Sequence, residues 1–437
     1  MATPILRVEI DFANGASFAY PLILDDGAYG ILDTNILGDQ PADIVDISDM
    51  VMRCSTRRGR NRILSNFEAG SATVVLNDPE SWFNPQNQDS PFWDPETNTS
   101  KVLPLRKIRI YALTPEDGDL VEVNIFSGYI VTYDTGFYDG VYTTSMVTLQ
   151  CVDGFRLLNN VSTGEDPVPG CTTPQLSGIR VQQLLNFSGF PASMRNTFAG
   201  QSTMQPDPGV ARSVLAAIQT VEQSEFGAFF MQRNGRTLFL DRYNVIERAD
   251  VPVRVYSDTG DLGSFPYQQI DFAYDDQLII NDVTVTKYGP GSVPQTVSDL
   301  PSIEKFFTKS GQRTGILVQT DQEANDQART LLASRKNADL RIDSITLNNY
   351  ADLSDLNLIV NLNSDIYNLI FVEKQMSGGS NIQKELFIQG VQHDITPKTW
   401  VTKLLTSEPL IQGFILGSEL QGILGDTVPQ NTNTLSY

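Results

Sequence analysis

Hydrophobic and polar residues alternate over much of the first 160 positions, which is typical of β-strands that bury one face. In the segment LRVEIDF (6–12), every second residue from Leu6 to Phe12 is apolar and the residues between them are charged. The same alternation recurs in three later segments, at 107–113, 120–133 and 145–152. Gly128 interrupts one of them, which indicates a bulge or a close approach of another backbone. The pattern predicts an N-terminal β-domain over 1–160 with a long loop at 77–104.

Between 161 and 250 the spacing of apolar residues becomes helical. Residues three and four positions apart line two helical faces, with Val181, Leu184 and Leu185 on the first and Val214, Ile218 and Val221 on the second. Gly227 is placed to cap the second helix, and the pair Asn234-Gly235 is typical of a tight hairpin turn. We therefore expect a small α+β insert over 161–250.

Alternation returns after 250 and predicts a second β-domain over 251–410. One helix is expected within it, at 321–336, because Thr320 and Glu323 have the spacing of a capping box and apolar residues follow at helical intervals. The segment 411–437 is rich first in Gly and then in Asn and Thr, which indicates an extended arm. The predicted fold class is mainly β, with two β-barrel or sandwich domains and a small α+β domain.

Composition narrows the class of protein. Among 437 residues, 52 are acidic and 31 are basic, which gives a net charge of −21 at pH 7. This excess of acid opposes binding to a nucleic-acid backbone, but it suits the wall of a passage through which a polyanion moves without sticking. No apolar run reaches the roughly 18 residues that a membrane span requires. The three cysteines are scattered and Cys151 lies on an apolar strand face, which indicates free thiols and synthesis in a reducing cytosol.

Candidate catalytic and metal-binding residues are few. The sole histidine, His393, alternates with apolar neighbours and is interpreted as a packed or interface residue. The sequence has no nucleophile elbow, phosphate loop or dinucleotide-binding motif. Glu222 and Glu225 lie three positions apart on an expected helix, where a solvated face is favoured over an acid/base pair. We therefore predict a protein that is not an enzyme and has no catalytic residues, metal or cofactor.

Two charged segments have alternative interpretations. Five acids of the long loop could bind calcium, although their spacing departs from the known calcium-loop pattern: Asp78, Glu80, Asp89, Asp94 and Glu96. The basic run RCSTRRGRNR (53–62) is interpreted as a surface turn that pairs with acids of a neighbouring subunit, in preference to a nucleic-acid contact.

The loop at 77–104 contains two of the three tryptophans. Trp82, Phe83, Phe92 and Trp93 stand among prolines, asparagines and acids that break secondary structure. Exposed aromatic residues commonly mark a partner surface, so these four are predicted to anchor a contact between neighbouring subunits. Six apolar residues of the segment GFILGSELQGILGD are predicted to dock on an adjacent protein, namely Phe414, Ile415, Leu416, Leu420, Ile423 and Leu424.

Seven stretches, taken in order, resemble the tail hub proteins of long-tailed bacteriophages, which are also called minor tail or tail-associated proteins. They are RGRNRILSNFEAGSATVVLNDPESWFNPQNQDSPF, PLRKIRIYA, IFSGYIVTYD, VTLQCVDGFRLL, VLAAIQTVEQSEFGAFFMQRNGRTLFLDR, QARTLLASRKNADLRIDSITL and FIQGVQHDITPKTWVTKLLTSE. The resemblance covers 50–410 in patches. It departs from the family in the long loop, where a stretch that is often more basic is replaced by DPESWF (78–83).

The resemblance implies a structural protein of the virion, made in the host cytoplasm and located at the tail tip. In that family two β-domains of each protomer resemble the tail-tube subunit, so a homotrimer forms a pseudo-sixfold hub. Such a hub would adapt the sixfold tube to a threefold tip and form part of the channel for genome ejection. The implied partners are further copies of the chain, the distal tail or tube protein, the tape-measure protein and tip fibre or spike proteins, with DNA passing transiently through the lumen.

Two other functions remain open from the sequence. One is a hexameric distal tail ring protein, which would share the virion setting. The other is a carbohydrate- or receptor-binding tail protein that uses Trp82 and Trp93 as platforms for stacking sugars.

Overall fold

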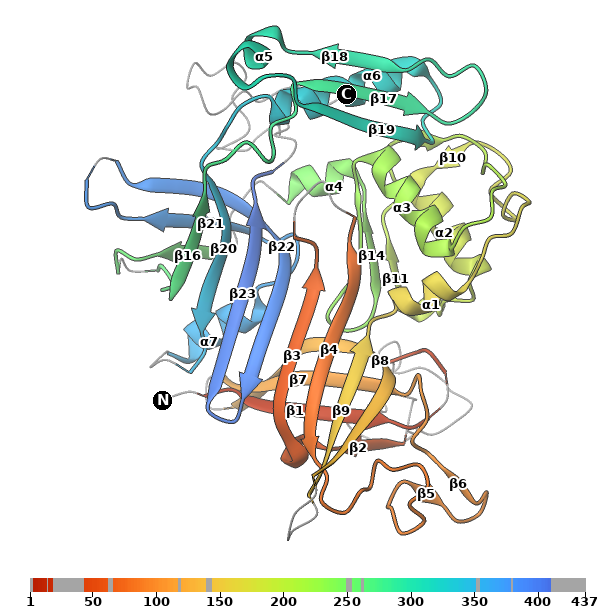
Figure 1. Cartoon of the computed structure of the whole chain (residues 1–437), viewed down its shortest axis with the longest axis vertical. Helices are drawn as coiled ribbons and strands as arrows, with labels where there is room; N and C mark the ends of the chain where they lie inside the picture. The colour runs from red at the N-terminus through yellow and green to blue at the C-terminus, as the bar shows by residue number, and fades with distance from the viewer. Residues whose placement is uncertain are drawn as a thin grey trace.

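The computed structural model describes residues 3–13, 15–18, 43–61, 66–116, 119–138, 144–248, 254–260, 263–350, 354–378 and 380–409. Strands dominate these residues, and most of them join one large sheet (Figure 1). The expectation of a mainly β fold is therefore confirmed.

Within the described residues, thirteen strands form the main sheet. Seven come from the first part of the chain: β1 (Ile5–Asp11), β2 (Ile44–Asp46), β3 (Val51–Gly59), β4 (Glu68–Asn77), β7 (Lys107–Glu116), β8 (Asp119–Tyr138) and β9 (Thr144–Val152). Six come from the last part: β15 (Arg254–Ser257), β16 (Gln269–Ala273), β20 (Arg341–Asn348), β21 (Leu369–Lys374), β22 (Ile382–Thr396) and β23 (Thr399–Ser407). Their order is β16-β20-β23-β22-β3-β4-β9-β8-β7-β1-β2, and β21 joins β15 to β22.

The two parts of the chain meet where β3 pairs with β22. The pairing is antiparallel and runs from Gly59 opposite Gly390 to Cys54 opposite Ile395. Figure 1 shows β4, β3, β22 and β23 side by side at the centre of the molecule. Backbone hydrogen bonds therefore continue across the point at which two separate β-domains were expected to divide.

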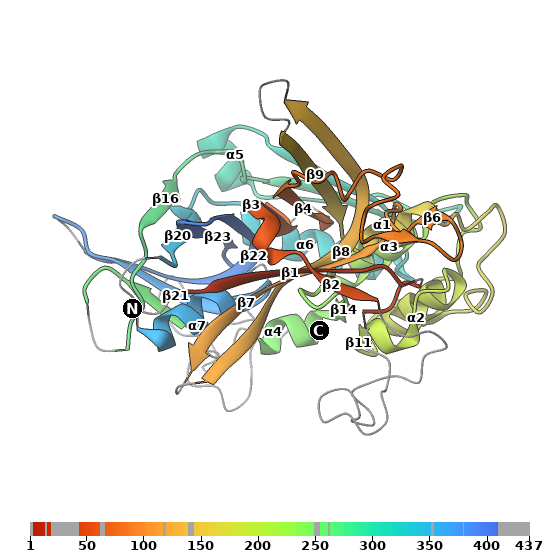
Figure 2. The same ribbon diagram turned by 90° about the horizontal axis from the view of Figure 1, so that it is seen from below.

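Strand β8 changes partner along its length. Its first half pairs with β7 and its second half pairs with β9. Seen from below, the two hairpins extend toward opposite sides of the molecule (Figure 2). A Cβ added at Gly128, between these halves, would lie 2.5 Å from the carbonyl oxygen of Val152 and 2.6 Å from the Phe126 ring. The close approach predicted from this glycine is therefore confirmed.

The core of the first part is closed by residues from the last part. Alternate residues of β1 and β7, among them Val8, Ile10 and Ile108, are fully buried in it. Helix α7 (Asp355–Asn363) adds Leu358 and Leu362 to the same cluster. The short 3-10 helix η1 (Ser48–Met50) follows β2 at the outer end of this core.

Four helices and five short strands lie between residues 155 and 248, that is, in the expected insert and just before it. The helices are α1 (Phe155–Asn160), α2 (Ser177–Phe187), α3 (Val214–Glu225) and α4 (Arg242–Glu247). The strands are β10 (Gln175–Leu176), β11 (Arg195–Thr197), β12 (Thr203–Met204), β13 (Ala228–Met231) and β14 (Thr237–Leu240), and a 3-10 helix η2 (Ala192–Met194) precedes β11. The predicted buried faces of α2 and α3 are confirmed, as is the β13–β14 hairpin, in which Gly235 has φ +82°. One detail was wrong: the residue that caps the C-terminus of α3 is Phe226, which takes the left-handed conformation at φ 56°, and not Gly227.

A third unit has a core of its own. Strands β17 (Asp282–Lys287), β18 (Gln295–Ser298) and β19 (Ser310–Ile316) form a small sheet with helices α5 (Leu300–Phe306) and α6 (Asp321–Arg335). It lies at one end of the molecule, at the top of Figure 1. The predicted capping box of α6 is present, because the Thr320 side chain accepts from the Glu323 amide and the Glu323 side chain accepts from the Thr320 amide.

The domain limits near 160, 250 and 410 stay a prediction. The β3–β22 pairing crosses two of these limits. A second hydrophobic cluster also joins the insert to the last part of the chain, because it contains residues of α2 and α3 together with Leu369 and Phe387.

Candidate contact site

The long loop begins with a turn that Asp78 organises. Asp78 is fully buried, and its two carboxylate oxygens accept the backbone N–H groups of Trp82 (2.8 Å) and Phe83 (3.1 Å). Its own amide donates to the Ser145 carbonyl at 2.9 Å, which ties the loop to β9. The acid therefore fixes the direction in which the two aromatic residues leave the sheet.

Two of the four predicted contact residues belong to the protomer's own core. Phe83 is 0% exposed and Phe92 is 4% exposed. Their ring centroids are 5.0 Å apart, and the Phe92 ring also packs, tilted by 36°, against Phe12 with the centroids 4.9 Å apart. The loop is thus anchored from inside, and the outward contact predicted for it must come from other side chains.

Trp82 and Trp93 are the loop aromatics with accessible surface. Trp82 is 37% exposed and meets Phe92 edge-on, with the ring centroids 6.4 Å apart. Trp93 is half-buried and pairs through the short strand β5 (Trp93–Asp94) with β6 (Thr99–Ser100). The structure therefore brings Trp82, Phe83 and Phe92 into one cluster and places Trp93 beside it.

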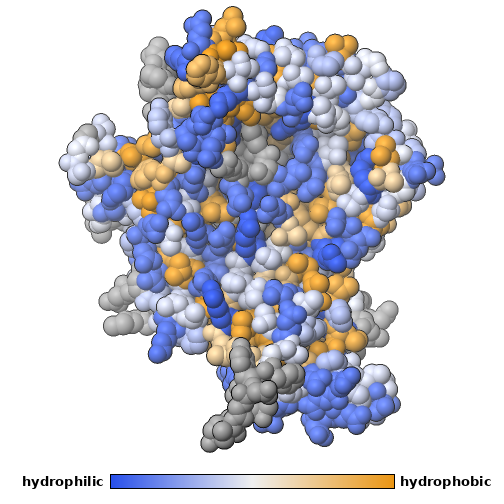
Figure 3. All heavy atoms as spheres, in the orientation of Figure 1, coloured by the Kyte–Doolittle hydropathy of each residue, from blue (hydrophilic) through white to orange (hydrophobic). Residues whose placement is uncertain are grey.

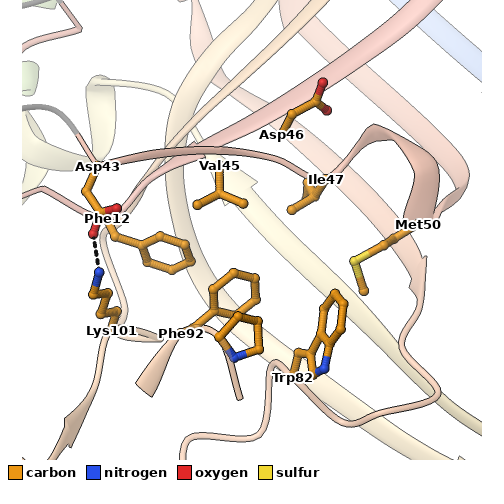
Figure 4. A pocket seen from close by; sticks show the side chains of 10 residues that line it. Phe12, Asp43, Val45, Asp46, Ile47, Met50, Trp82, Phe92 and Lys101 are labelled. Carbon is orange, nitrogen blue, oxygen red and sulfur yellow. Dashed lines mark hydrogen bonds and ion pairs between the residues drawn. The ribbon is translucent and has the colours of Figure 1, made fainter. Parts of the chain in front are cut away.

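A pocket of about 270 Å³ opens between the loop and the edge strand β2. Its walls are largely apolar and consist of Phe12, Val45, Ile47, Met50, Trp82, Pro91 and Phe92, with Asp43, Asp46 and Lys101 as the polar lining. Figure 4 shows Val45 and Ile47 facing Phe92 and Trp82 across the pocket, while the Asp46 carboxylate points away from it. This pocket could not be predicted from the sequence, because its walls come from segments more than 30 positions apart.

Ion pairs frame the pocket. Lys101 contacts Asp43 at 2.7 Å at one end of the pocket (Figure 4). Arg7 contacts Asp46 at 3.1 Å. In the same loop, hydrogen bonds from the Thr97 hydroxyl and from backbone amides lower the pKa of Asp94. In the part of the chain that is described, no three potential metal-binding side chains come together, and the calcium interpretation gains no support.

The described part of the basic run 53–62, residues 53–61, is not a surface turn, contrary to the prediction. Most of it forms β3, at the centre of the main sheet, where side chains alternate between the two faces. Arg53 and Arg57 stay exposed and pair with Asp394 and Glu68, but Arg58 and Arg60 are buried. Local charge density therefore misled the sequence interpretation, since burial of an arginine depends on partners that lie far away in the chain.

Arg58 and Arg60 bind partners in the last part of the chain. Arg58 donates to Asp365 at 2.6 Å, and Arg60 donates to Gln389 at 2.8 Å and to the Tyr367 hydroxyl at 2.7 Å. Arg60 also lies over the Phe67 ring at 4.3 Å. These buried contacts fix the first part of the chain against the last part.

The expected solvated face of Glu222 and Glu225 was also wrong. Both side chains are buried, at 4% and 0% exposure. Glu225 accepts hydrogen bonds from the Ser177 hydroxyl and the Ser202 amide, while Glu222 faces Arg60 at 4.0 Å. Helical periodicity placed them at the edge of the apolar face, and the neighbouring strands extend the buried surface beyond that edge.

His393 is a packed residue, as predicted. It is 4% exposed, and its Nδ1 lies 2.9 Å from the Thr402 hydroxyl and 3.2 Å from the Trp400 indole nitrogen. Burial lowers the pKa of His393 to about 3, so the ring is neutral at physiological pH. Cys151 is likewise a buried free thiol.

Other surface features bear on possible partners. Orange residues gather over α5 at the top of Figure 3, where Leu300 and Phe307 are 70% and 83% exposed. None of the helices described is both long and apolar enough to cross a bilayer. The six predicted docking residues of the C-terminal arm, Phe414, Ile415, Leu416, Leu420, Ile423 and Leu424, lie outside the described residues.

Comparison with known proteins finds likeness in structure alone. No family model and no curated protein matches the sequence. A tail protein of Neisseria meningitidis MC58 matches with a TM-score of 0.52 at 15% identity, over 83% of this chain and 93% of its own. The 43 kDa tail protein of prophage MuSo2 from Shewanella oneidensis matches with a TM-score of 0.52 at 11% identity, over 82% of this chain and 95% of its own. The chain therefore has the fold of phage-type tail proteins, and the resemblance of its sequence is confirmed at the level of the fold.

Proposed function

We propose that the chain is a structural protein of a phage tail and that three copies form a hub at the distal end of the tail tube. The observation that carries this proposal is the extent of the structural likeness. It spans 93% and 95% of two tail proteins, so it concerns nearly a whole protomer and not one shared motif.

The joined sheet supports the trimeric arrangement. Strands of the first and last parts of the chain form two β-rich halves that are fixed to each other by the β3–β22 pairing. A sixfold tube offers six equivalent positions, and three protomers can meet all six if each presents two similar surfaces. A rigid junction would hold those two surfaces at a constant angle.

The charge of the chain supports a role along the ejection path. A net charge of −21 would keep DNA from adhering to a lumen wall made of this protein. The proposed role is non-enzymatic, and its partners would be further copies of the chain, the distal tail or tube protein, the tape-measure protein and the tip fibre or spike proteins.

The number of copies in the ring tests the proposal. Native mass spectrometry of the ring isolated from tails is expected to give three times the mass of one chain. Six times that mass would overturn the trimeric hub and would support a hexameric distal tail ring. Absence of the chain from purified tails would overturn the structural role itself.

A further inference from the structure

We propose that the apolar residues of the C-terminal segment 414–424 pack against an exposed apolar patch on α5 of the same chain. The patch, called the α5 patch below, consists of Leu300 at the start of α5 and Phe307 just after its end. The proposal concerns a single copy of the chain, so it goes beyond the proposed function and can fail without affecting it.

Both side chains of the α5 patch are largely accessible. Leu300 is 70% exposed and Phe307 is 83% exposed, and orange residues gather at this place at the top of Figure 3. The residues on both sides of the patch, 263–350, are all described. About two turns of helix, or roughly 11 Å, separate its two members. Large apolar side chains that lie close together on a surface favour contact with another apolar group.

Phe307 has a backbone conformation that costs free energy. Its φ is 59° and its ψ is 172°, a combination that is adopted almost only by glycine. The buried side chain of Asn281 holds this turn, because it donates to the Phe307 carbonyl and accepts from the Lys309 amide, both at 2.8 Å. The chain therefore keeps an aromatic residue, with its ring exposed, at a position that suits glycine. Strain of this kind is concentrated at contact and functional sites, which indicates that the exposed ring has a partner.

The described chain ends beside the same unit. Strand β23 runs toward the third unit (Figure 1), and Glu408 follows its last residue. The charge of Glu408 partly opposes the lowering of the Arg335 pKa by burial, so Glu408 lies near the last turn of α6. Lys336 then joins α6 to the start of α5, because its carbonyl accepts from the Ser302 hydroxyl at 2.5 Å and its Nζ contacts Asp299 at 2.9 Å. The segment that follows Glu408 therefore starts near the α5 patch.

The length and composition of the segment suit this surface. Six of the eleven residues at 414–424 are apolar, and all eleven lie outside the described residues. An extended residue spans about 3.3–3.6 Å, so residues 410–413 can cover roughly 13–14 Å and the segment itself roughly 36–40 Å. The segment can therefore reach both members of the patch from the end of β23. The same segment of a neighbouring copy has the same apolar chemistry, but it does not start beside this patch.

Photo-cross-linking of the full chain identifies the occupant of the patch. p-Benzoylphenylalanine is placed at position 307, or at position 293 as a control. Val293 is 55% exposed in the same unit, but its amide donates to Asp321 at the opposite end of α6. We expect irradiation to link position 307, but not position 293, to residues 414–424 in a product with the mass of one chain.

Three results of this experiment would overturn the proposal. A product with twice the mass of one chain would assign the segment to a neighbouring copy. Absence of any link from position 307 to residues 414–424 would show that the segment does not cover the patch. Equal links from positions 293 and 307 would show contact without preference for the patch.

Hydroxyl-radical oxidation measures whether the segment covers Phe307. The double variant Leu416→Asp, Leu420→Asp is expected to raise the oxidation rate of Phe307 at least about threefold, because buried unpaired carboxylates are unfavourable on an apolar surface. The double variant Ser418→Asp, Gln421→Asp adds the same charge at polar positions and is expected to change the rate less than about 1.5-fold. An equal oxidation rate of Phe307 in the parent and both variants would overturn the proposal.

Phe307→Gly separates the contact from the stability of the fold. Glycine adopts the conformation of residue 307 without strain, so the variant is expected to unfold at nearly the same urea concentration as the parent. With p-benzoylphenylalanine at position 300, the yield of the link to residues 414–424 is expected to fall at least about fivefold in the variant. An unchanged yield would show that the Phe307 ring takes no part in the contact and would overturn the proposal.

Discussion

Glu222 and Glu225 lie three positions apart on α3, and their buried carboxylates differ in their hydrogen bonding. Glu225 accepts hydrogen bonds from the Ser177 hydroxyl at 2.8 Å and the Ser202 amide at 2.7 Å. Neither carboxylate oxygen of Glu222 accepts a hydrogen bond of good geometry among the described residues, and its weak polar neighbours are Arg60, 4.0 Å away, and the Phe229 amide. Burial raises the pKa of Glu222 to about 7, and the Arg60 charge only partly opposes that rise.

The raised pKa of Glu222 makes the stability of the protein depend on pH. In the unfolded chain this carboxyl loses its proton near its ordinary pKa of 4.5, while in the folded chain it keeps the proton until about pH 7. Stability therefore falls as pH rises through this interval. We expect Glu222→Gln to be more stable than the parent, with an advantage that grows by about 2 kcal/mol between pH 5.5 and pH 8. Urea unfolding at the two pH values measures this difference.

Glu225→Gln is the matched control for that prediction. Its amide would face the donors of Ser177 and Ser202, so we expect a loss of about 1–3 kcal/mol at both pH values. An advantage of Glu222→Gln that does not change with pH would contradict the assignment of the buried proton to Glu222.

Residue types alone predicted part of these environments. The spacing of Thr320 and Glu323 specified a capping box, because both partners lie within one turn of helix. The burial of Arg58 could not be predicted, because its partner Asp365 is 307 positions away. The same holds for the pocket at Trp82, which requires β2 and loop 77–104 to come together. The sequence therefore indicated the aromatic loop, but it did not show which of the aromatic side chains are buried in the core and which keep accessible surface.

At the scale of elements, the β3–β22 pairing depends on two facing glycines. Gly59 has φ +97°, and a Cβ added there would lie 2.3 Å from the Gln389 carbonyl oxygen and 2.6 Å from the Gly390 Cα. These atoms belong to the backbone of β22, so they cannot move aside as a flexible side chain would. Periodicity predicted both strands, but it contains no information on which strands become neighbours.

We expect Gly59→Ala to lower the free energy of unfolding by at least about 2 kcal/mol, because it combines backbone strain with a clash at the junction. Gly136→Ala in β8 is the control, since its nearest neighbour would be the Met146 carbonyl oxygen at 3.9 Å. Gly136→Ala is expected to leave the free energy of unfolding nearly unchanged. Denaturant unfolding of both variants provides the comparison, and equal stability of the two would show that the junction tolerates a wider spacing.

At the scale of the whole molecule, neighbouring residues of one loop serve folding and assembly separately. Phe83 is fully buried in the core, whereas Trp82 lies at the pocket and keeps 37% of its surface exposed. We expect Phe83→Ala to destabilise the isolated chain by about 3–5 kcal/mol because it opens a cavity in the core. Trp82→Ala is expected to leave thermal unfolding nearly unchanged. It is expected to weaken the free energy of binding to a tail partner by about 2 kcal/mol.

Two measurements distinguish these roles: thermal unfolding of the isolated chain, and the fraction of each variant that sediments with assembled tails. If Trp82→Ala unfolds the monomer while its recovery in tails stays normal, the loop serves the core alone and its proposed contact role fails.

The β3–β22 junction also has a consequence for the order of events during synthesis. Gly59 leaves the ribosome well before its partner Gly390 is made, and at about 5–20 residues per second the interval is roughly 15–70 s. Throughout that time the hydrogen-bonding edge of β3 that β22 will cover has no native partner, and open edges attract strands of other chains. When many copies are translated close together, shielding of the nascent chains would therefore prevent wrong pairing of β3. Faster elongation would shorten the time for which this edge is exposed, whereas a more stable final fold would not.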